Sequence, residues 1–69
     1  MRRLRVKDIL KERGISMGLL SRGSNVPLNT VRRLVNDTNY IPSALTLMRV
    51  ADYLQVKMDD LYEEDPGSD

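Results

Sequence analysis

Residues 17–36 read MGLLSRGSNVPLNTVRRLVN, and two short helical patterns in this stretch are separated by a turn signal. Asn25 lies between the two patterns, and asparagine is one of the few residues besides glycine that tolerate a positive φ. Pro27 suits the first turn of the following helix, where its missing N–H has no intrahelical partner. The stretch therefore predicts a helix over about 17–23, a tight turn and a second helix over 28–36.

These two helices have the side chains needed to pack at a steep angle. Ser21 is a small residue at the position where the second helix would cross the first. Val31 and Leu34 are branched apolar residues at inward positions of the second helix, and Leu20 and Val26 complete the core. The arrangement matches the helix-turn-helix pattern, whose second helix enters the major groove of DNA.

The surrounding sequence predicts further short helices and no strand, because no alternating pattern is present. Val6, Ile9 and Leu10 follow helical spacing, Gly14 is a stop signal, and Ser16 and Ser43 are candidate N-caps. The expected fold is all-α and compact, with five helices at about 3–13, 17–23, 28–36 and 44–54 and a short fifth marked by Met58 and Leu61.

The chain is expected to form one small domain over residues 1–62, followed by an acidic, disordered tail over 63–69. It contains no Cys and no His, which excludes thiol chemistry, disulfides and the usual general base. No metal site, cofactor or small-molecule ligand is evident. No apolar run approaches the roughly 20 residues of a membrane span, and the N-terminus lacks the apolar block of a signal peptide, so we expect a cytoplasmic protein.

Charge is unevenly distributed along the chain. Residues 1–36 carry nine Lys or Arg and two acidic residues, a net charge of +7, whereas residues 37–69 carry two basic and eight acidic residues, a net charge of −6. The basic half favours an anionic partner. The alternative is a solvated surface whose charges balance within the molecule. The basic cluster Arg2, Arg3, Arg5 and Lys7 is expected to be solvated and to act at long range. The alternative is a flexible arm close to the DNA backbone.

The chain resembles the lambda-repressor-like (Cro/XRE-type) helix-turn-helix domains over about residues 4–62. The resemblance rests on GIS at 14–16, NTVRRLVN at 29–36 and IPSALTLMRVADYLQVKMDDLY at 41–62. It implies five helices, sequence-specific binding of double-stranded DNA, usually as a dimer, and a repressor-like role in transcription. Three positions of the motif depart from the usual residues: Met17 replaces a phosphate-binding Gln, Asn25 replaces a turn glycine, and Pro27 replaces a capping Ser or Thr.

Candidate base contacts lie on the N-terminal and outward part of the second helix of the motif, at Leu28, Asn29, Arg32 and Arg33. Asn29 can bind adenine N6 and N7, and either arginine can bind guanine O6 and N7. Leu28 is suited to a thymine methyl group. The alternatives are that the arginines form an ordinary solvated face, or that Arg33 contacts phosphate instead of a base.

Candidate phosphate contacts flank this helix, and they would fix register without reading sequence. They are Ser16, Met17, Arg22, Asn36, Thr38, Asn39 and Tyr40. Asn36 matches a phosphate-contacting position of the resembled family, and its alternative role is a helix C-cap. Ser16 is the weaker candidate because an N-cap explains it, and Met17 would act only through its backbone.

A weak homodimer is expected through about residues 44–62, because one recognition helix buries little surface and a two-fold dimer doubles the contact. The candidate interface residues are Leu45, Met48, Tyr53, Met58 and Tyr62. The alternative is a monomer with ordinary exposed apolar residues.

A protein-binding adaptor or antitoxin-like module with the same fold is the competing function. The acidic run from 59 to 65 favours a solvated face over an enzyme site, and the absence of Phe and Trp disfavours single-strand binding.

Overall fold

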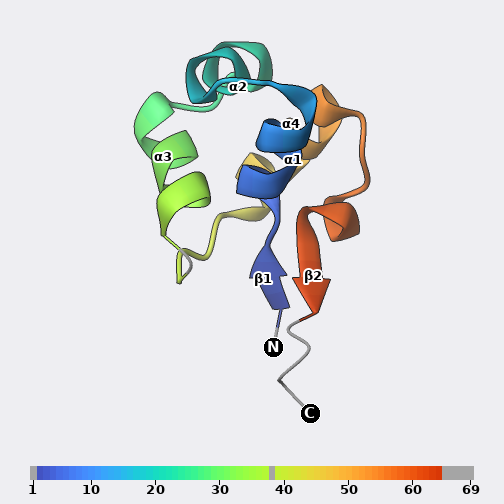
Figure 1. The fold of residues 1–69 in the computed structure, drawn as a ribbon. Coiled ribbons are helices and arrows are strands. Elements are labelled where there is room, and N and C mark those ends of the chain that lie inside the picture. Colours follow the sequence, from blue (N-terminus) through green and yellow to red (C-terminus); the bar gives the residue numbers. More distant parts are fainter. Residues whose placement is uncertain (1, 38, 65–69) are drawn as a thin grey trace.

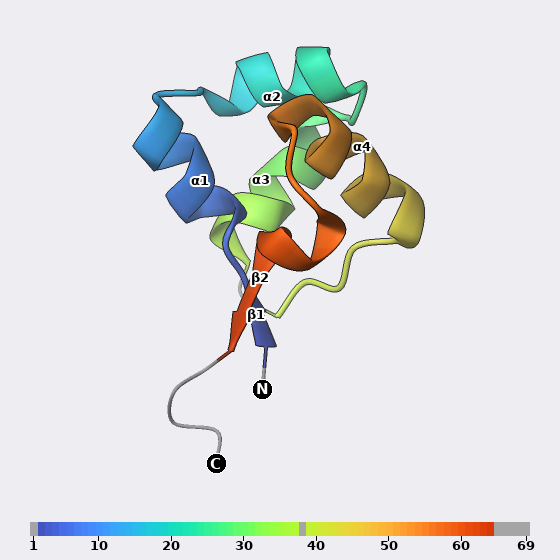
Figure 2. The same ribbon diagram turned by 90° about the vertical axis from the view of Figure 1, so that its right-hand side faces the viewer.

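The computed structural model describes residues 2–37 and 39–64 (Figure 1). The elements in chain order are β1 (Arg2–Leu4), α1 (Val6–Arg13), α2 (Met17–Ser24), α3 (Leu28–Asn36), α4 (Ala44–Leu54), the 3-10 helix η1 (Met58–Leu61) and β2 (Tyr62–Glu64). The helices surround one core, and the two strands form a short ribbon where the beginning and end of the chain lie together (Figures 1 and 2). Within the described residues, no helix is long and apolar enough to cross a bilayer.

The helix boundaries follow from local signals in the sequence. Ser16 begins α2, because its Oγ accepts a hydrogen bond from the backbone N–H of Leu19 at 3.0 Å. Ser43 begins α4 in the same way, with its Oγ 3.2 Å from the backbone N of Thr46. Gly14 ends α1 in the left-handed region at φ 66°. These three predictions are confirmed, as are the bounds 28–36 and 44–54.

The core contains the apolar residues expected from helical spacing, and every α-helix contributes to it. Its buried hydrophobic members are Val6, Ile9, Leu10, Leu20, Val26, Val31, Leu34, Val50, Ala51, Leu54 and Leu61. Leu47 and Val35 are half-buried against this cluster. The core therefore fixes how α2 and α3 lie relative to α1 and α4.

The expectation of an all-α chain is wrong at its two ends. β1 pairs antiparallel with β2, with Arg3 opposite Glu63 and Leu4 opposite Tyr62. The backbone N–H of Arg5 continues this pairing by donating to the Leu61 carbonyl at 2.7 Å. Because residues 2–4 are extended in the ribbon, the first helix begins at Val6 and not near residue 3.

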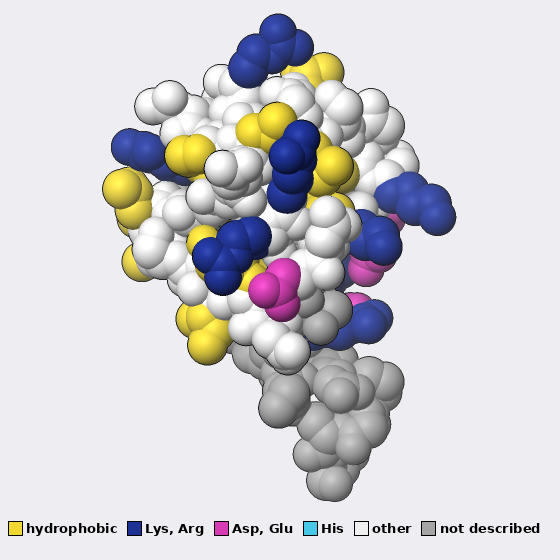
Figure 3. Space-filling model, turned by 90° about the vertical axis from the view of Figure 1, so that its left-hand side faces the viewer, with side chains coloured by type: hydrophobic (Ala, Val, Ile, Leu, Met, Phe, Trp, Pro, Cys, Tyr) yellow, Lys and Arg dark blue, Asp and Glu magenta, His cyan; other side chains and the backbone are white. Residues whose placement is uncertain are grey.

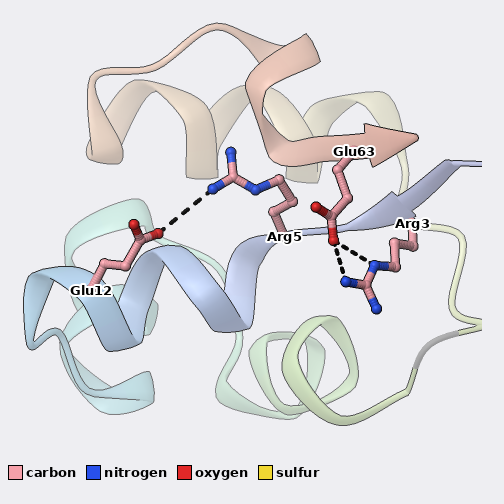
Figure 4. A network of polar contacts seen from close by, with 4 residues as sticks. All are labelled: Arg3, Arg5, Glu12 and Glu63. Atoms are coloured by element: carbon pink, nitrogen blue, oxygen red, sulfur yellow. Dashed lines mark hydrogen bonds and ion pairs between the residues drawn. The ribbon is translucent and has the colours of Figure 1, made fainter. Parts of the chain in front are cut away.

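The basic cluster at the start of the chain is tied to acidic residues in the same molecule. Arg3 forms an ion pair with Glu63 across the ribbon, and Arg5 lies 3.6 Å from Glu12 of α1 (Figure 4). Lys7 is exposed, as the solvated interpretation requires. Arg3 and Arg5 therefore each have an acidic partner within the molecule, in addition to any effect at long range.

The expected fifth helix is a single 3-10 turn, so the described residues contain four α-helices and not five. Leu61 is fully buried, and β2 begins at the next residue, which leaves no room for a longer helix. Glu63 and Glu64, assigned from the sequence to the acidic tail, are part of β2. The remaining tail residues, 65–69, lie outside the described residues.

Candidate nucleic-acid interface

The turn between α2 and α3 is built on Asn25. This residue has φ 58° and ψ 39°, in the left-handed region, and its backbone N–H donates to the Ser21 carbonyl. The Ser21 hydroxyl in turn donates to the carbonyl of Val26 at 2.6 Å, while the Val26 N–H donates back to the Ser21 carbonyl at 3.2 Å. Ser21 therefore ties the turn to the body of α2 through both its backbone and its hydroxyl group.

Helix α4 supports this turn from behind. The ring of Tyr53 packs directly on Gly23, so closely that a Cβ atom there would lie 2.0 Å from Cε1 of the ring. One helical turn earlier, Arg49 donates to the Asn25 carbonyl at 3.2 Å. The sequence indicates only that Gly23 weakens α2, and the contact with Tyr53 explains why a glycine is needed there.

Helix α3 has one buried side and one polar, exposed side. Pro27 immediately precedes the helix at φ −55°, as its N-cap residue and not within its first turn. Val31 and Leu34 are buried, whereas the exposed residues follow i, i+3, i+4, i+7 spacing along the opposite side. These exposed residues are Asn29, Arg32, Arg33 and Asn36. We call them the polar face of α3, and Leu28, 37% exposed, lies beside it.

The surface around α3 carries mainly basic charge. Figure 3 shows this side of the molecule, on which Lys and Arg side chains are widely spread and acidic side chains are few. Apolar side chains lie between the basic ones. Such a surface suits an extended anionic partner that also presents apolar groups, as the major groove of DNA does.

The candidate phosphate contacts at the start of the motif differ in whether their side chains are available to a partner. The Ser16 hydroxyl already caps α2, and the side chain of Met17 is half-buried against the core. Arg22 is exposed beside the turn and lines a shallow hollow together with Ser21 and Asn25. Of these three candidates, Arg22 alone carries a charge, and its side chain is exposed and available to a phosphate.

Asn39 and Tyr40, two of the candidates after α3, donate backbone hydrogen bonds to Asp37. Asn36 is the last residue of α3 and is exposed, while the C-cap position belongs to Asp37. The backbone N–H of Asn39 donates to Asp37 Oδ1 at 3.0 Å, and that of Tyr40 donates to the Asp37 carbonyl at 3.2 Å. Thr38 lies outside the described residues.

Two candidate contacts that sequence analysis did not pair, Arg33 and Tyr40, lie against each other. The guanidinium carbon of Arg33 lies 4.4 Å from the centre of the Tyr40 ring, within the range of a cation–π interaction. Six residues separate them in the sequence, and their approach depends on where the chain goes after α3 ends, which helical spacing does not encode. A basic residue near an aromatic one across a helix end was the only available signal.

The five candidate interface residues do not form a single exposed surface. Leu45 and Met48 are each 55% exposed and line a shallow hollow with Met58, bordered by Arg49 and Asp52. We call this the α4 hollow. The other two candidates, Tyr53 and Tyr62, are half-buried against the core.

An eight-residue helix, a left-handed turn and an exposed polar helix together define a helix-turn-helix protein. The sequence profile of the Cro/C1-type HTH DNA-binding domain matches residues 5–67, and the chain belongs to this family. A comparison with curated proteins found no significant match.

Proposed function

We propose that this domain is a sequence-specific, repressor-like regulator of transcription that places α3 in the major groove of double-stranded DNA. The polar face of α3 carries the proposal, because it combines amide and guanidinium groups at helical spacing on a helix held by a helix-turn-helix. Membership of a DNA-binding domain family supports the same partner.

In this proposal, the N-terminal half of α3 reads bases. Asn29 binds adenine through its amide, and Arg32 binds guanine through two N–H groups. Leu28, exposed at the start of the helix, contacts a thymine methyl group. Arg33 is the remaining candidate base contact, and its alternative is a phosphate. All four side chains are exposed in the free protein, so binding requires no rearrangement of the core.

Phosphate contacts come from both sides of α3. The proposed set is Ser16, Met17, Arg22, Asn36, Thr38 and Asn39, with Ser16 and Met17 acting chiefly through the backbone at the start of α2. Tyr40, the remaining candidate, is left out of this set because its ring packs against the core and its backbone N–H already donates to the Asp37 carbonyl. An N–H group at a helix N-terminus is a suitable donor to a phosphate oxygen. These contacts would position the domain without contributing to base preference.

Selection from a random duplex library, followed by affinity measurements over a range of salt concentrations, tests the proposal. Asn29→Ala and Arg32→Ala should each cost about 1–3 kcal/mol on the selected site and relax one or two base positions. Affinity should fall steeply with salt, with a slope of about −0.9 per neutralised phosphate. Lys57→Gln is the matched control, since it removes a positive charge from the connection between α4 and η1, across the molecule from α3 (Figure 1). A flat salt dependence would rule out the proposal.

We further propose a weak homodimer through the α4 hollow, which would double the DNA contact. Arg49 and Asp52 border the apolar residues of this hollow with opposite charges. A two-fold axis through the hollow brings each of these charges near its opposite on the second copy, so the surface is self-complementary. Leu45, Met48 and Met58 would form the apolar centre, with Tyr53 and Tyr62 contributing only their exposed edges.

The exposed apolar residues of the α4 hollow also favour a second candidate, a protein-binding or antitoxin-like module with the same fold. The two functions differ in their response to duplex DNA. Low-salt binding to random duplexes, lost when Arg32 and Arg33 are both replaced by Gln, supports the regulator. Failure to bind any duplex at low salt supports the second candidate.

A further inference from the structure

Tyr40 is held as a rigid platform beside the end of α3. Its ring is half-buried against the core, and its backbone N–H donates to the Asp37 carbonyl at 3.2 Å. The adjacent Asn39 N–H donates to the Asp37 side chain, so Asp37 accepts hydrogen bonds from both Asn39 and Tyr40. Both the backbone and the ring of Tyr40 are therefore constrained before any partner binds.

Arg33 lies on this platform with its donors free. Its guanidinium carbon is 4.4 Å from the ring centre, and among the described residues it makes no hydrogen bond and no ion pair. A stacked guanidinium uses its face, so the N–H groups in its plane remain available. The side chain is exposed, in the last turn of α3.

We propose that Tyr40 is a positioning residue that holds Arg33 ready for a two-point contact with a DNA phosphate at the edge of the major groove. The inference rests on the proposed function and resolves the choice left open for Arg33. Base readers of a recognition helix lie toward its N-terminus. Arg33, in contrast, belongs to the last turn of α3, and its guanidinium lies on the ring of Tyr40, beyond the end of the helix. The planar fork of arginine matches two phosphate oxygens.

This arrangement stabilises the complex by lowering the cost of ordering Arg33. A free arginine loses much side-chain entropy when it is immobilised on a ligand. Because the Tyr40 ring already restricts Arg33, part of that loss occurs during folding. The role needs the aromatic ring of Tyr40 and not its hydroxyl group, which distinguishes it from a direct phosphate contact by Tyr40.

Affinities of Tyr40 and Arg33 variants for a selected duplex and for random duplexes test the proposal. Tyr40→Phe keeps the ring and should bind like the wild type, whereas Tyr40→Leu should bind roughly three- to tenfold more weakly to both duplexes. Arg33→Lys should show a similar loss, because an ammonium group keeps the charge without the planar fork. In an Arg33→Ala background, Tyr40→Leu should cause no further loss. Lys57→Gln again controls for loss of positive charge.

The stack itself is measured without DNA by NMR. The δ protons of Arg33 should be shifted upfield by the ring current, and the shift should persist in Tyr40→Phe and disappear in Tyr40→Leu. Absence of the shift in the wild type would overturn the platform. Equal loss of affinity in the Phe and Leu variants would overturn the positioning role alone, and a changed base preference in Arg33→Ala would overturn the phosphate contact alone. Failure of the wild type to bind any duplex would overturn the proposed function together with the role of Arg33 in it.

Discussion

The ring of Tyr53 occupies the space that a side chain would need at Gly23, with three ring carbons within 2.7 Å of the ideal Cβ position. Glycine in the middle of a helix costs up to about 1 kcal/mol relative to alanine. Here that cost is offset by the close approach of α4 to α2. The contact sets the distance between the supporting helix and the helix-turn-helix.

Gly23→Ala should lower the free energy of unfolding by about 1–3 kcal/mol, because the added methyl group forces the Tyr53 ring out of its packed position. Gly18→Ala is the matched control in the same helix. Its new methyl would meet only Ser16 Oγ, at 4.0 Å, so this change should be neutral or stabilising by up to about 1 kcal/mol. Chemical denaturation measures both, and an equal response of the two variants would contradict the packing argument.

Asn25 should accept glycine but reject a β-branched residue. Its left-handed conformation at φ 58° suits Asn and Gly, and the groups it uses in the turn are its backbone N–H and carbonyl. Asn25→Gly should change stability by only a few tenths of a kcal/mol, whereas Asn25→Val should cost about 1–2 kcal/mol or more. Thermal unfolding is the measurement, and a tolerated valine would show that the turn relaxes to another conformation.

Leu45→Asp should abolish self-association if the α4 hollow is the dimer surface. Leu45 is 55% exposed, so the change places a charge in the proposed interface without disturbing the core. Leu19→Asp is the control, since Leu19 is similarly exposed, at 46%, but lies on α2. Sedimentation over a wide concentration range should show a weak dimer for the wild type and the control. A wild type that stays monomeric on a palindromic duplex would contradict the dimer.

The ion pair of the ribbon should contribute little, and the arginine at the end of α1 should contribute more. Arg3 is 63% exposed in its pair with Glu63, so Glu63→Gln should cost less than about 1 kcal/mol, and less still in high salt. Arg13, in contrast, donates to the partly buried Leu54 carbonyl at the end of α4. Arg13→Leu should therefore cost about 1–3 kcal/mol. Denaturation at two salt concentrations compares them, and the reverse order would contradict this ranking.

The central part of the fold was predictable because its signals are local. Asn25, Ser16 and Ser43 each act on backbone groups a few residues away, and helical spacing identified the buried sides of α1 and α3. The outward position of Asn29 and Arg32 followed from the same spacing. The bounds predicted for α2, α3 and α4 agree with the structure to within one residue.

The parts that sequence analysis missed depend on contacts between distant residues. β1 and β2 are three residues each, too short for an alternating pattern, and they form only because residues 2–4 and 62–64 meet. The packing of Tyr53 on Gly23 and the stacking of Arg33 on Tyr40 likewise depend on how helices and loops are placed in space. The residue types at these positions do not identify the residues that they contact.

Because the ribbon brings residues 2–4 next to residues 62–64, the order of the helices along the chain could be changed without changing their arrangement in space. Because Arg2 lies opposite Glu64, a short linker could join these positions without crossing the domain. New ends could then be opened at the exposed Gly14, between α1 and α2. Such a circular permutant would keep α2, the turn and α3 uninterrupted, and the same neighbouring ends would allow the domain to be inserted into a surface loop of a host protein.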